Sequence, residues 1–216
     1  MVSGFFLTFE GIEKSGKTTQ ADLLVDRLRA EGRDVVFTLE PGGTRLGEGA
    51  RRLLLDPNLG MEVSQRAEVF LFAADRAQHI EEVIRPALDA GKLVISDRFV
   101  DSTIAYQGHG RGVDLAELNT IQEFATGGLR PDLTVLVDVD VDTSRARMEA
   151  ADRLESEDDG FFERVREGYL SLWRAEPERI LRVDGRMPLR MLSEAIYAEV
   201  DRQIGGDGER TASGGV

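Results

Sequence analysis

Cysteine is absent from this chain of 216 residues. Thiol catalysis, Cys-ligated zinc, iron–sulfur clusters and a disulfide framework are therefore excluded. No apolar run is long enough to cross a bilayer, and no basic-then-apolar leader follows Met1. Basic residues are also in deficit, with 27 against 40 acidic residues and a net charge of −13. A broad nucleic-acid footprint is not expected from that balance. We expect a soluble, cytoplasmic globular protein with no membrane partner.

The length predicts one domain, since domains average roughly 150 residues and a chain of this size buries roughly 70% of its surface. Residues 1–204 are expected to form that single domain. Residues 205–216 are rich in glycine and poor in apolar residues, which predicts a flexible tail.

Short apolar runs alternate with amphipathic stretches of helical length along the chain. The runs that predict strands are 5–10, 35–39, 93–96, 133–137 and 180–183. The stretches that predict helices are 17–31, 65–84 (interrupted at Pro86), 115–126, 143–150, 161–175 and 188–204. This alternation favours a doubly wound parallel sheet of about five strands, covered by helices on both faces. Polar residues 151–160 predict a small mobile lid over about 145–160.

A glycine-rich motif follows the first predicted strand and opens the first predicted helix. The segment from Gly11 to Thr18 fits G-x-x-x-x-G-K-[ST] in the context that a phosphate-binding loop requires. Its amides would face phosphate oxygens, Lys17 would reach the β- and γ-phosphates, and Thr18 would ligate Mg²⁺. The plainer alternative is an ordinary turn with solvated lysines. The predicted ATP-binding residues here are Gly11, Ile12, Glu13, Lys14, Ser15, Gly16, Lys17, Thr18 and Thr19.

Asp97 and Arg98 follow the strand 93–96, at the edge of the sheet where ligands bind. Asp97 could hold Mg²⁺ or accept a proton, and Arg98 could clamp a second phosphate. Such a pair favours phosphoryl transfer to a phosphate acceptor, because two anions must be held in line. A surface ion pair is the alternative. Asp138 and Asp140 resemble a second magnesium strand but rank below Asp97.

Other candidates have plain and functional interpretations of similar weight. The segment from Glu40 to Thr44 is either a ligand-contacting loop or a turn. Phe72 and Arg76 share a helix face that could contact a base, or could be a core phenylalanine beside a solvated arginine. The arginines around the polar segment are either a solvated face or a lid that closes over a triphosphate, with Arg153 ranked above Arg145 and Arg147. The two histidines, His79 and His109, are expected at the surface or at a helix cap.

Taken together, these motifs resemble the thymidylate kinase family. The resemblance is carried by FEGIEKSGKTTQ (9–20), EPGGT (40–44), LFAADRAQH (71–79), DRFVDSTIAYQG (97–108) and the lid-to-helix segment ADRLE…FFERVREGYL. It implies a P-loop NTPase-type fold, ATP as co-substrate, Mg²⁺, thymidine 5′-monophosphate (dTMP) as acceptor, and a homodimer packed through helices.

The resemblance also implies residue roles. Phe72 would stack on thymine, Arg76 would bond its O4, and Thr103 would face the base edge. Arg98 would bind the acceptor phosphate, and Arg145 and Gly185 would form the adenine side. The remaining positions implied on the acceptor side are Glu13, Glu40, Pro41, Ser102, Tyr106 and Gln107.

Two departures from the family pattern bear on mechanism. Leu39 stands where the family commonly has arginine before EPGGT. The chain also has both Lys14 in the phosphate loop and arginines in the lid, so either Lys14 or Arg153 could stabilise the migrating phosphoryl group. Two other functions stay open at this point: a kinase for another nucleoside monophosphate or a deoxynucleoside, and a nucleotide-dependent binding switch. The switch is disfavoured because Asp97 is followed by Arg98 and Phe99 and not by a nearby glycine.

Overall fold

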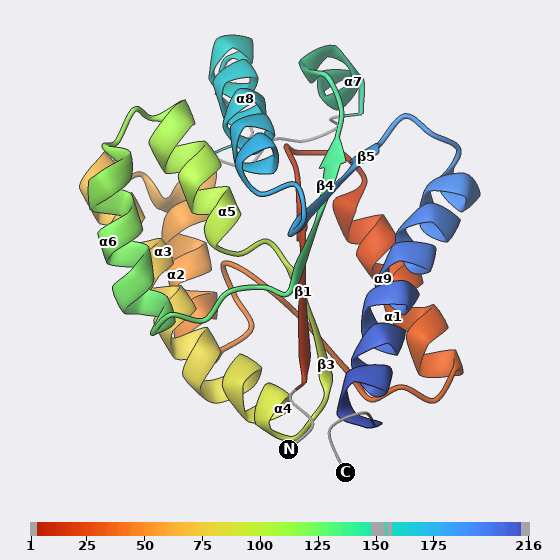
Figure 1. The fold of residues 1–216 in the computed structure, drawn as a ribbon. Coiled ribbons are helices and arrows are strands. Elements are labelled where there is room, and N and C mark those ends of the chain that lie inside the picture. Colours follow the sequence, from red (N-terminus) through yellow and green to blue (C-terminus); the bar gives the residue numbers. More distant parts are fainter. Residues whose placement is uncertain (1–3, 148–153, 155–156, 213–216) are drawn as a thin grey trace.

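The computed structural model describes residues 4–147, 154 and 157–212. Five parallel strands form one sheet in the order β2-β3-β1-β4-β5 (Figure 1). The strands are β1 (Phe5–Glu10), β2 (Val35–Leu39), β3 (Leu93–Asp97), β4 (Leu133–Asp138) and β5 (Ile180–Asp184). The predicted α/β fold class is confirmed.

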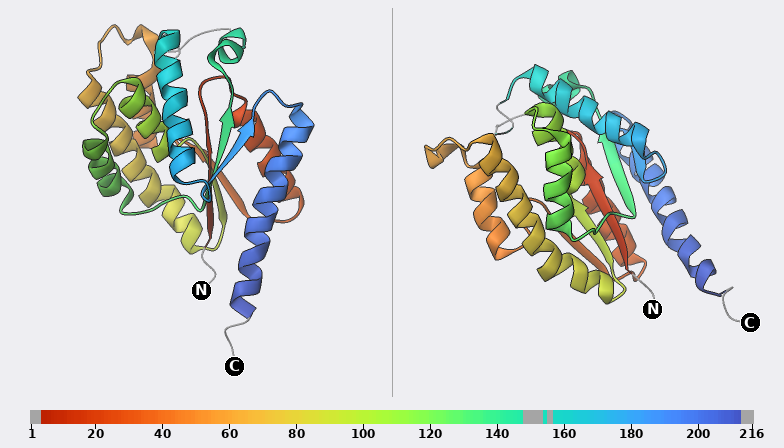
Figure 2. Two further views of the ribbon diagram at one scale, coloured as in Figure 1. Left: turned by 45° about the horizontal axis from the view of Figure 1, so that its top comes forward. Right: turned by 60° about the vertical axis from the view of Figure 1, so that its left-hand side comes forward.

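Strand β1 shows why the sheet is covered on both faces. Its residues are buried throughout, and successive side chains point to opposite faces. Phe5, Leu7 and Phe9 pack with α1 (Lys17–Ala30) and α9 (Leu189–Ala212) on one face. Phe6 packs on the other face against Ile80 and its neighbours. Figure 2 shows the sheet between these two helical layers.

The second layer holds most of the remaining helices. They are α2 (Arg45–Leu55), η1 (Pro57–Leu59), α3 (Gln65–His79), η2 (Ile80–Ile84), α4 (Arg85–Asp89), α5 (Val100–Thr103), η3 (Ile104–Gly110), α6 (Leu115–Thr126) and α8 (Asp159–Ala175). The short helix α7 (Val141–Ala146) follows β4 at the carboxyl end of the sheet (Figure 1).

Two helical segments have no counterpart in the sequence prediction. Helix α2 contains Gly47 and Gly49, and glycine in a helix interior costs about 1 kcal/mol relative to alanine, which hides the signal. Its start is fixed by the Thr44 hydroxyl, which accepts from the Gly47 amide at 2.9 Å. The second segment, residues 100–110, is mostly π-helix, so its side chains do not follow the 3.6-residue period.

Two predicted helix limits also differ from the structure. Pro86 does not interrupt the long helix, because the π segment η2 precedes it and Pro86 lies in the first turn of α4, where a missing N–H is tolerated. The predicted flexible tail begins at residue 205, whereas α9 continues to Ala212. An existing helix adds one hydrogen bond for each residue it extends. Residues 213–216 of that tail lie outside the described part of the chain.

Candidate active site

A cavity of about 550 Å³ opens at the carboxyl ends of the strands, where a doubly wound sheet places its ligands. It joins the phosphate loop, the start of the segment after β3, and the helix that carries Phe72. The predicted residues that line it are Glu13, Lys14, Gly16, Lys17, Thr18, Thr19, Glu40, Pro41, Phe72, Arg76, Asp97, Arg98, Ser102, Thr103, Tyr106 and Gln107.

The phosphate loop has the backbone that its sequence predicts. Gly11 and Gly16 have φ values of 144° and 99°, which side chains rarely adopt. A Cβ on Gly11 would lie 2.4 Å from the carbonyl oxygen of Val137. Lys17 begins α1 and is buried. Burial, followed by the charge of Arg98, lowers the pKa of Lys17, so a bound anion would stabilise its charged form.

Thr18 and Asp97 meet at one edge of the cavity. The Thr18 hydroxyl donates to Oδ2 of Asp97 at 2.5 Å, while Oδ1 of Asp97 is buried and has no hydrogen-bond partner. Within the described ranges, no group of three or more acidic, histidine or cysteine side chains is placed to hold a metal ion. Mg²⁺ usually takes one or two protein oxygens, water and substrate phosphates, and Thr18 with Asp97 fits that donor set.

Arg98 is held from several directions in a strained backbone conformation. Its φ of 74° is left-handed, which is uncommon for a residue with a side chain. Its guanidinium donates to Oε1 of Glu13 at 2.8 Å, to the hydroxyls of Tyr106 and Ser102 at 3.2 and 3.0 Å, and to that of Tyr169 at 3.1 Å. The sequence therefore predicts the guanidinium, and the structure adds the shell that aims it.

Behind Arg98 lies Glu10, a carboxyl group that the sequence analysis does not single out. Glu10 is fully buried and accepts from the Phe99 amide at 2.8 Å, the Ser102 hydroxyl at 2.6 Å and the Tyr169 hydroxyl at 3.0 Å. Burial, reinforced by the charge of Asp101, raises its pKa to about 7. Tyr169 comes from α8, so this network joins the helix after the predicted lid to the Arg98 site.

Arg76 is a buried wall of the cavity and not a solvated side chain. Its Nε and Nη2 lie 2.9 and 2.7 Å from Oε2 of Glu40. Its Nη1 donates to the Thr103 hydroxyl at 3.1 Å and also to Oε1 of Gln122. The structure thus brings Phe72, Arg76 and Thr103 to one end of the cavity, as the sequence predicts.

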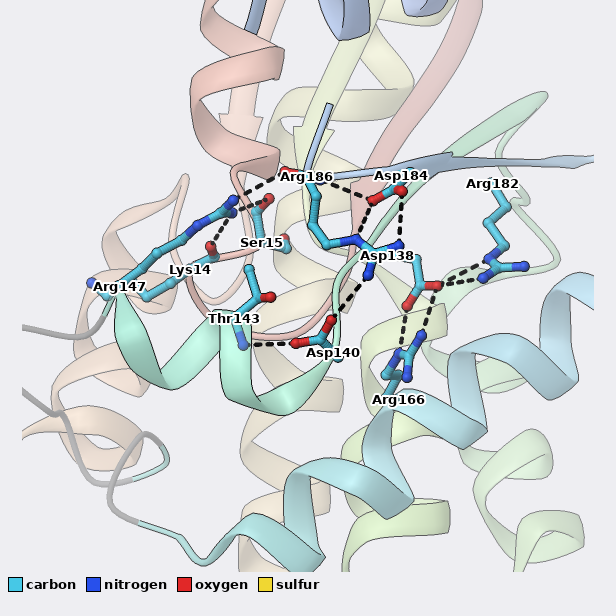
Figure 3. Close-up of polar contacts among 11 residues, drawn as sticks. Lys14, Ser15, Asp138, Asp140, Thr143, Arg147, Arg166, Arg182, Asp184 and Arg186 are labelled. Atoms are coloured by element: carbon cyan, nitrogen blue, oxygen red, sulfur yellow. Dashed lines mark hydrogen bonds and ion pairs between the residues drawn. The ribbon is translucent and has the colours of Figure 1, made fainter. Parts of the chain in front are cut away.

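On the opposite side, Arg147 takes the place predicted for Arg145 (Figure 3). Arg147 donates to the carbonyl oxygens of Lys14 and Ser15 at 3.1 and 3.3 Å and to that of Gly185 at 3.2 Å, and it lines the cavity. Arg145 instead pairs with Asp159 at 2.7 Å and lies over the ring of Phe162. A shift of two residues along a short helix decides which arginine faces the phosphate loop.

Asp138, the alternative magnesium aspartate, is held by two arginines (Figure 3). Arg166 contacts both of its carboxylate oxygens at 2.7 and 3.1 Å, and Arg182 contacts Oδ2 at 3.0 and 2.7 Å. The two hydrogen bonds from arginines lower the pKa of Asp138 against the opposing effect of burial, which is the largest single influence. These contacts support the lower rank that the sequence analysis gives to Asp138.

The remaining predicted positions have other placements. Gly11, Ile12, Ser15 and Gly185 lie beside the cavity without lining it, and Ile12 and Ser15 are buried. Arg153 and most of the predicted lid lie outside the described residues. The residues of the cavity wall that sequence reasoning does not rank as site residues are Leu39, Arg51, Leu55, Phe99, Arg147 and Leu154. Arg51 is on α2, and its Nη1 donates to the Pro41 carbonyl at 2.9 Å.

Comparison with known proteins agrees with this geometry. The family model described as thymidylate kinase matches residues 9–196. The chain is 51% identical over 193 residues to a thymidylate kinase of Desulfovibrio desulfuricans (85% of this chain, 88% of that protein) and 46% identical over 202 residues to one of Exiguobacterium sibiricum (92% and 95%). The chain belongs to the thymidylate kinase family.

A solved structure of the same family supports the fold. The crystal structure of the thymidylate kinase of Ehrlichia chaffeensis has a TM-score of 0.75 and 34% identity, with 92% of this chain and 99% of that chain covered. The family assignment makes this chain a kinase with a P-loop NTPase fold. Helices that are both long and apolar enough for a membrane span are not found among the residues that the model describes.

Proposed function

We propose that this member of the thymidylate kinase family transfers the γ-phosphoryl group of ATP to dTMP. The observation that carries the proposal is one cavity with two anion sites and a base site. Lys17 and the loop amides lie on one side, Arg98 lies in the middle, and Phe72 with Arg76 lies at the far end. This arrangement holds two anions together against their repulsion and reads a base at a fixed distance from one of them.

The donor side is assigned as follows. The phosphate-loop amides and the N-terminus of α1 bind the phosphates of ATP, and Lys17 compensates charge that grows on them. Arg147 and the backbone at Gly185 form the adenine side. Thr18 and Asp97 would hold Mg²⁺, which supplies neutralisation of the phosphate charge when bound.

The acceptor side is assigned by the same physical reasoning. Arg98 holds the phosphate of dTMP through a charge-assisted bond, and Arg51 lines the same cavity as a further cation. Phe72 offers a ring for stacking, while Arg76 and Thr103 offer groups for the base edge. Tyr106, hydrogen-bonded to Glu13 at 2.5 Å, stands beside the sugar.

The cation that stabilises the migrating phosphoryl group is assigned by experiment. Lys14 lines the cavity, and Arg153 is the competing candidate. A large loss of kcat in Lys14→Met with little effect in Arg153→Met would assign the role to Lys14, and the reverse result would assign it to the lid.

A coupled assay of ADP release tests the proposed function. Purified protein with ATP and Mg²⁺ is offered dTMP, dUMP, UMP, CMP or thymidine. We expect dTMP to give the highest kcat/KM, with dUMP the nearest competitor, since one methyl group contributes only about 1–3 kcal/mol. Another preferred acceptor would replace dTMP in the proposal. No ADP with any acceptor, together with nucleotide-dependent binding of a protein partner, would favour the switch.

We also propose a homodimer, as the family resemblance implies, formed through α2, α3 and α6. These helices carry the exposed apolar side chains Leu46, Leu53, Phe70 and Phe124, the last of them 91% exposed. Light scattering after gel filtration should give twice the monomer mass, and Phe124→Asp should lower it. A cytoplasmic location is part of the same proposal, because ATP and nucleoside monophosphates are held there.

A further inference from the structure

His79 lies behind the base site without lining the cavity. It is fully buried, which contradicts the surface or cap position that the sequence predicts. Both ring nitrogens have partners: Nδ1 is 3.0 Å from Oε1 of Glu40, and Nε2 is 2.6 Å from the hydroxyl of Thr38. Because Oε2 of Glu40 holds Arg76, a buried chain of contacts runs from Thr38 through His79 and Glu40 to the cavity wall.

The donors and acceptors in this chain have one consistent direction. A carboxylate paired with a guanidinium only accepts hydrogen bonds, so Nδ1 of His79 must carry the proton that faces Glu40. In a neutral ring, Nε2 then accepts from the Thr38 hydroxyl. The imidazole thus orients the carboxylate from one side while Arg76 binds it from the other.

The backbone around the ring leaves it little freedom. Helix α3 ends at His79, and the π segment η2 begins at the next residue. The loop after β2 lies directly on the ring: a Cβ on Gly43 would be 2.8 Å from Nε2 of His79 and 2.7 Å from the Thr38 hydroxyl. With a φ of +75°, Gly43 has the conformation that this close approach needs. The imidazole therefore fixes both Glu40 and the loop that brings Pro41 to the cavity.

We infer that His79 is a positioning residue for the acceptor base: by donating to Glu40, it fixes the carboxylate that holds Arg76 against the cavity. The inference rests on the proposed function, in which Arg76 contacts the base of dTMP. The base is remote from the phosphoryl group in transfer, so this contact acts equally before and during the reaction. Loss of positioning then raises KM for dTMP and leaves kcat and KM for ATP close to the wild-type values.

Three substitutions of His79 separate hydrogen bonding from space filling. His79→Asn keeps an N–H donor near the position of Nδ1, His79→Gln places its amide near Nε2, and His79→Leu fills the site without a donor. We expect His79→Leu and His79→Gln to raise KM for dTMP about five- to tenfold, as expected when a buried hydrogen bond to a charged group is lost. His79→Asn should stay within about twofold of wild type, because it restores that bond.

Two controls bracket the result. Thr38→Val removes only the outer contact and should give a smaller rise in KM for dTMP. Ile84→Val, in the same helical layer and also fully buried, should lower the denaturant midpoint without changing either KM. Circular dichroism checks that each variant is folded, and if His79→Leu is not, the Asn and Gln pair decides.

The outcomes distinguish this inference from the proposed function. If the wild-type protein does not phosphorylate dTMP, the proposed function fails. If it does, but the folded His79 variants keep the wild-type KM for dTMP, or if Asn and Gln raise it equally, the inference is overturned. Equal losses of kcat with both substrates would also overturn it, because they would indicate a general structural role.

Discussion

Replacing Arg98 with methionine separates its structural role from its role in binding. Methionine keeps an unbranched side chain at the same left-handed backbone position and removes only the guanidinium. Glu13 then loses a partner at 2.8 Å, in a pair whose side chains are 17% and 10% exposed. Breaking a buried ion pair by removing one partner costs about 3–5 kcal/mol. For a chain of this size, 1 kcal/mol corresponds to about 2–4 °C in Tm, so we expect a fall of at least about 6 °C.

The expected loss of activity is separate from this loss of stability. A charge-assisted contact to the acceptor phosphate contributes about 1.5–3 kcal/mol, so kcat/KM for dTMP should fall at least about tenfold. The double variant Arg98→Met with Glu13→Gln removes the uncompensated charge. We expect it to regain most of the lost Tm, measured by calorimetry, and none of the lost activity, measured by ADP release.

The refuting results are specific. Recovery of activity in the double variant would mean that Arg98 serves only to neutralise Glu13. An unchanged Tm in the single variant would mean that the pair contributes nothing to the fold, and the cost used above would be wrong.

Three further predictions concern other parts of the site. Lys17→Ala should lower kcat by orders of magnitude and leave the far-ultraviolet dichroism unchanged, because the ammonium group acts mainly on developing charge; near-normal kcat would remove Lys17 from the mechanism. Arg147→Ala should raise KM for ATP and leave KM for dTMP unchanged, since Arg147 bridges the phosphate loop and Gly185; equal effects on both would contradict the assignment. Burial and the charge of Glu40 raise the pKa of Asp75 to about 7 from 3.8, so the native state binds this proton more tightly than the unfolded state and stability falls as pH rises between about 4 and 7. Asp75→Asn should flatten that part of the profile of unfolding free energy against pH, and an unchanged profile would refute the pKa shift.

The fold and the phosphate-binding part of the site follow from local signals in the sequence. Glycine is required where Gly11 approaches the Val137 carbonyl, so the loop motif and its backbone are one constraint. Asp97 and Arg98 are placed by the end of β3, because parallel strands end at the same edge of the sheet. The buried strands are continuous apolar runs, which is the pattern that a sheet covered on both faces demands.

The parts that the sequence does not predict depend on how elements pack. Arg147 replaces Arg145 because α7 ends at Ala146, and helix ends are not fixed by composition to within two residues. Arg51 is missed with its glycine-containing helix. A polar residue on an amphipathic helix suggests an exposed position, so His79 requires knowledge that the loop after β2 packs on it. Tyr169 reaches Arg98 only because α8 packs against η3.

The strand order divides the two substrates between two halves of the sheet. β2 and β3 lead into the acceptor groups Glu40 and Arg98, whereas β4 and β5 lead into the segments that carry Arg147 and Gly185, and β1 stands between the halves. A small molecule confined to the β2–β3 half would compete with the monophosphate and not with the triphosphate. Selective inhibition of this kinase therefore does not require an ATP mimic, which many P-loop proteins would also bind.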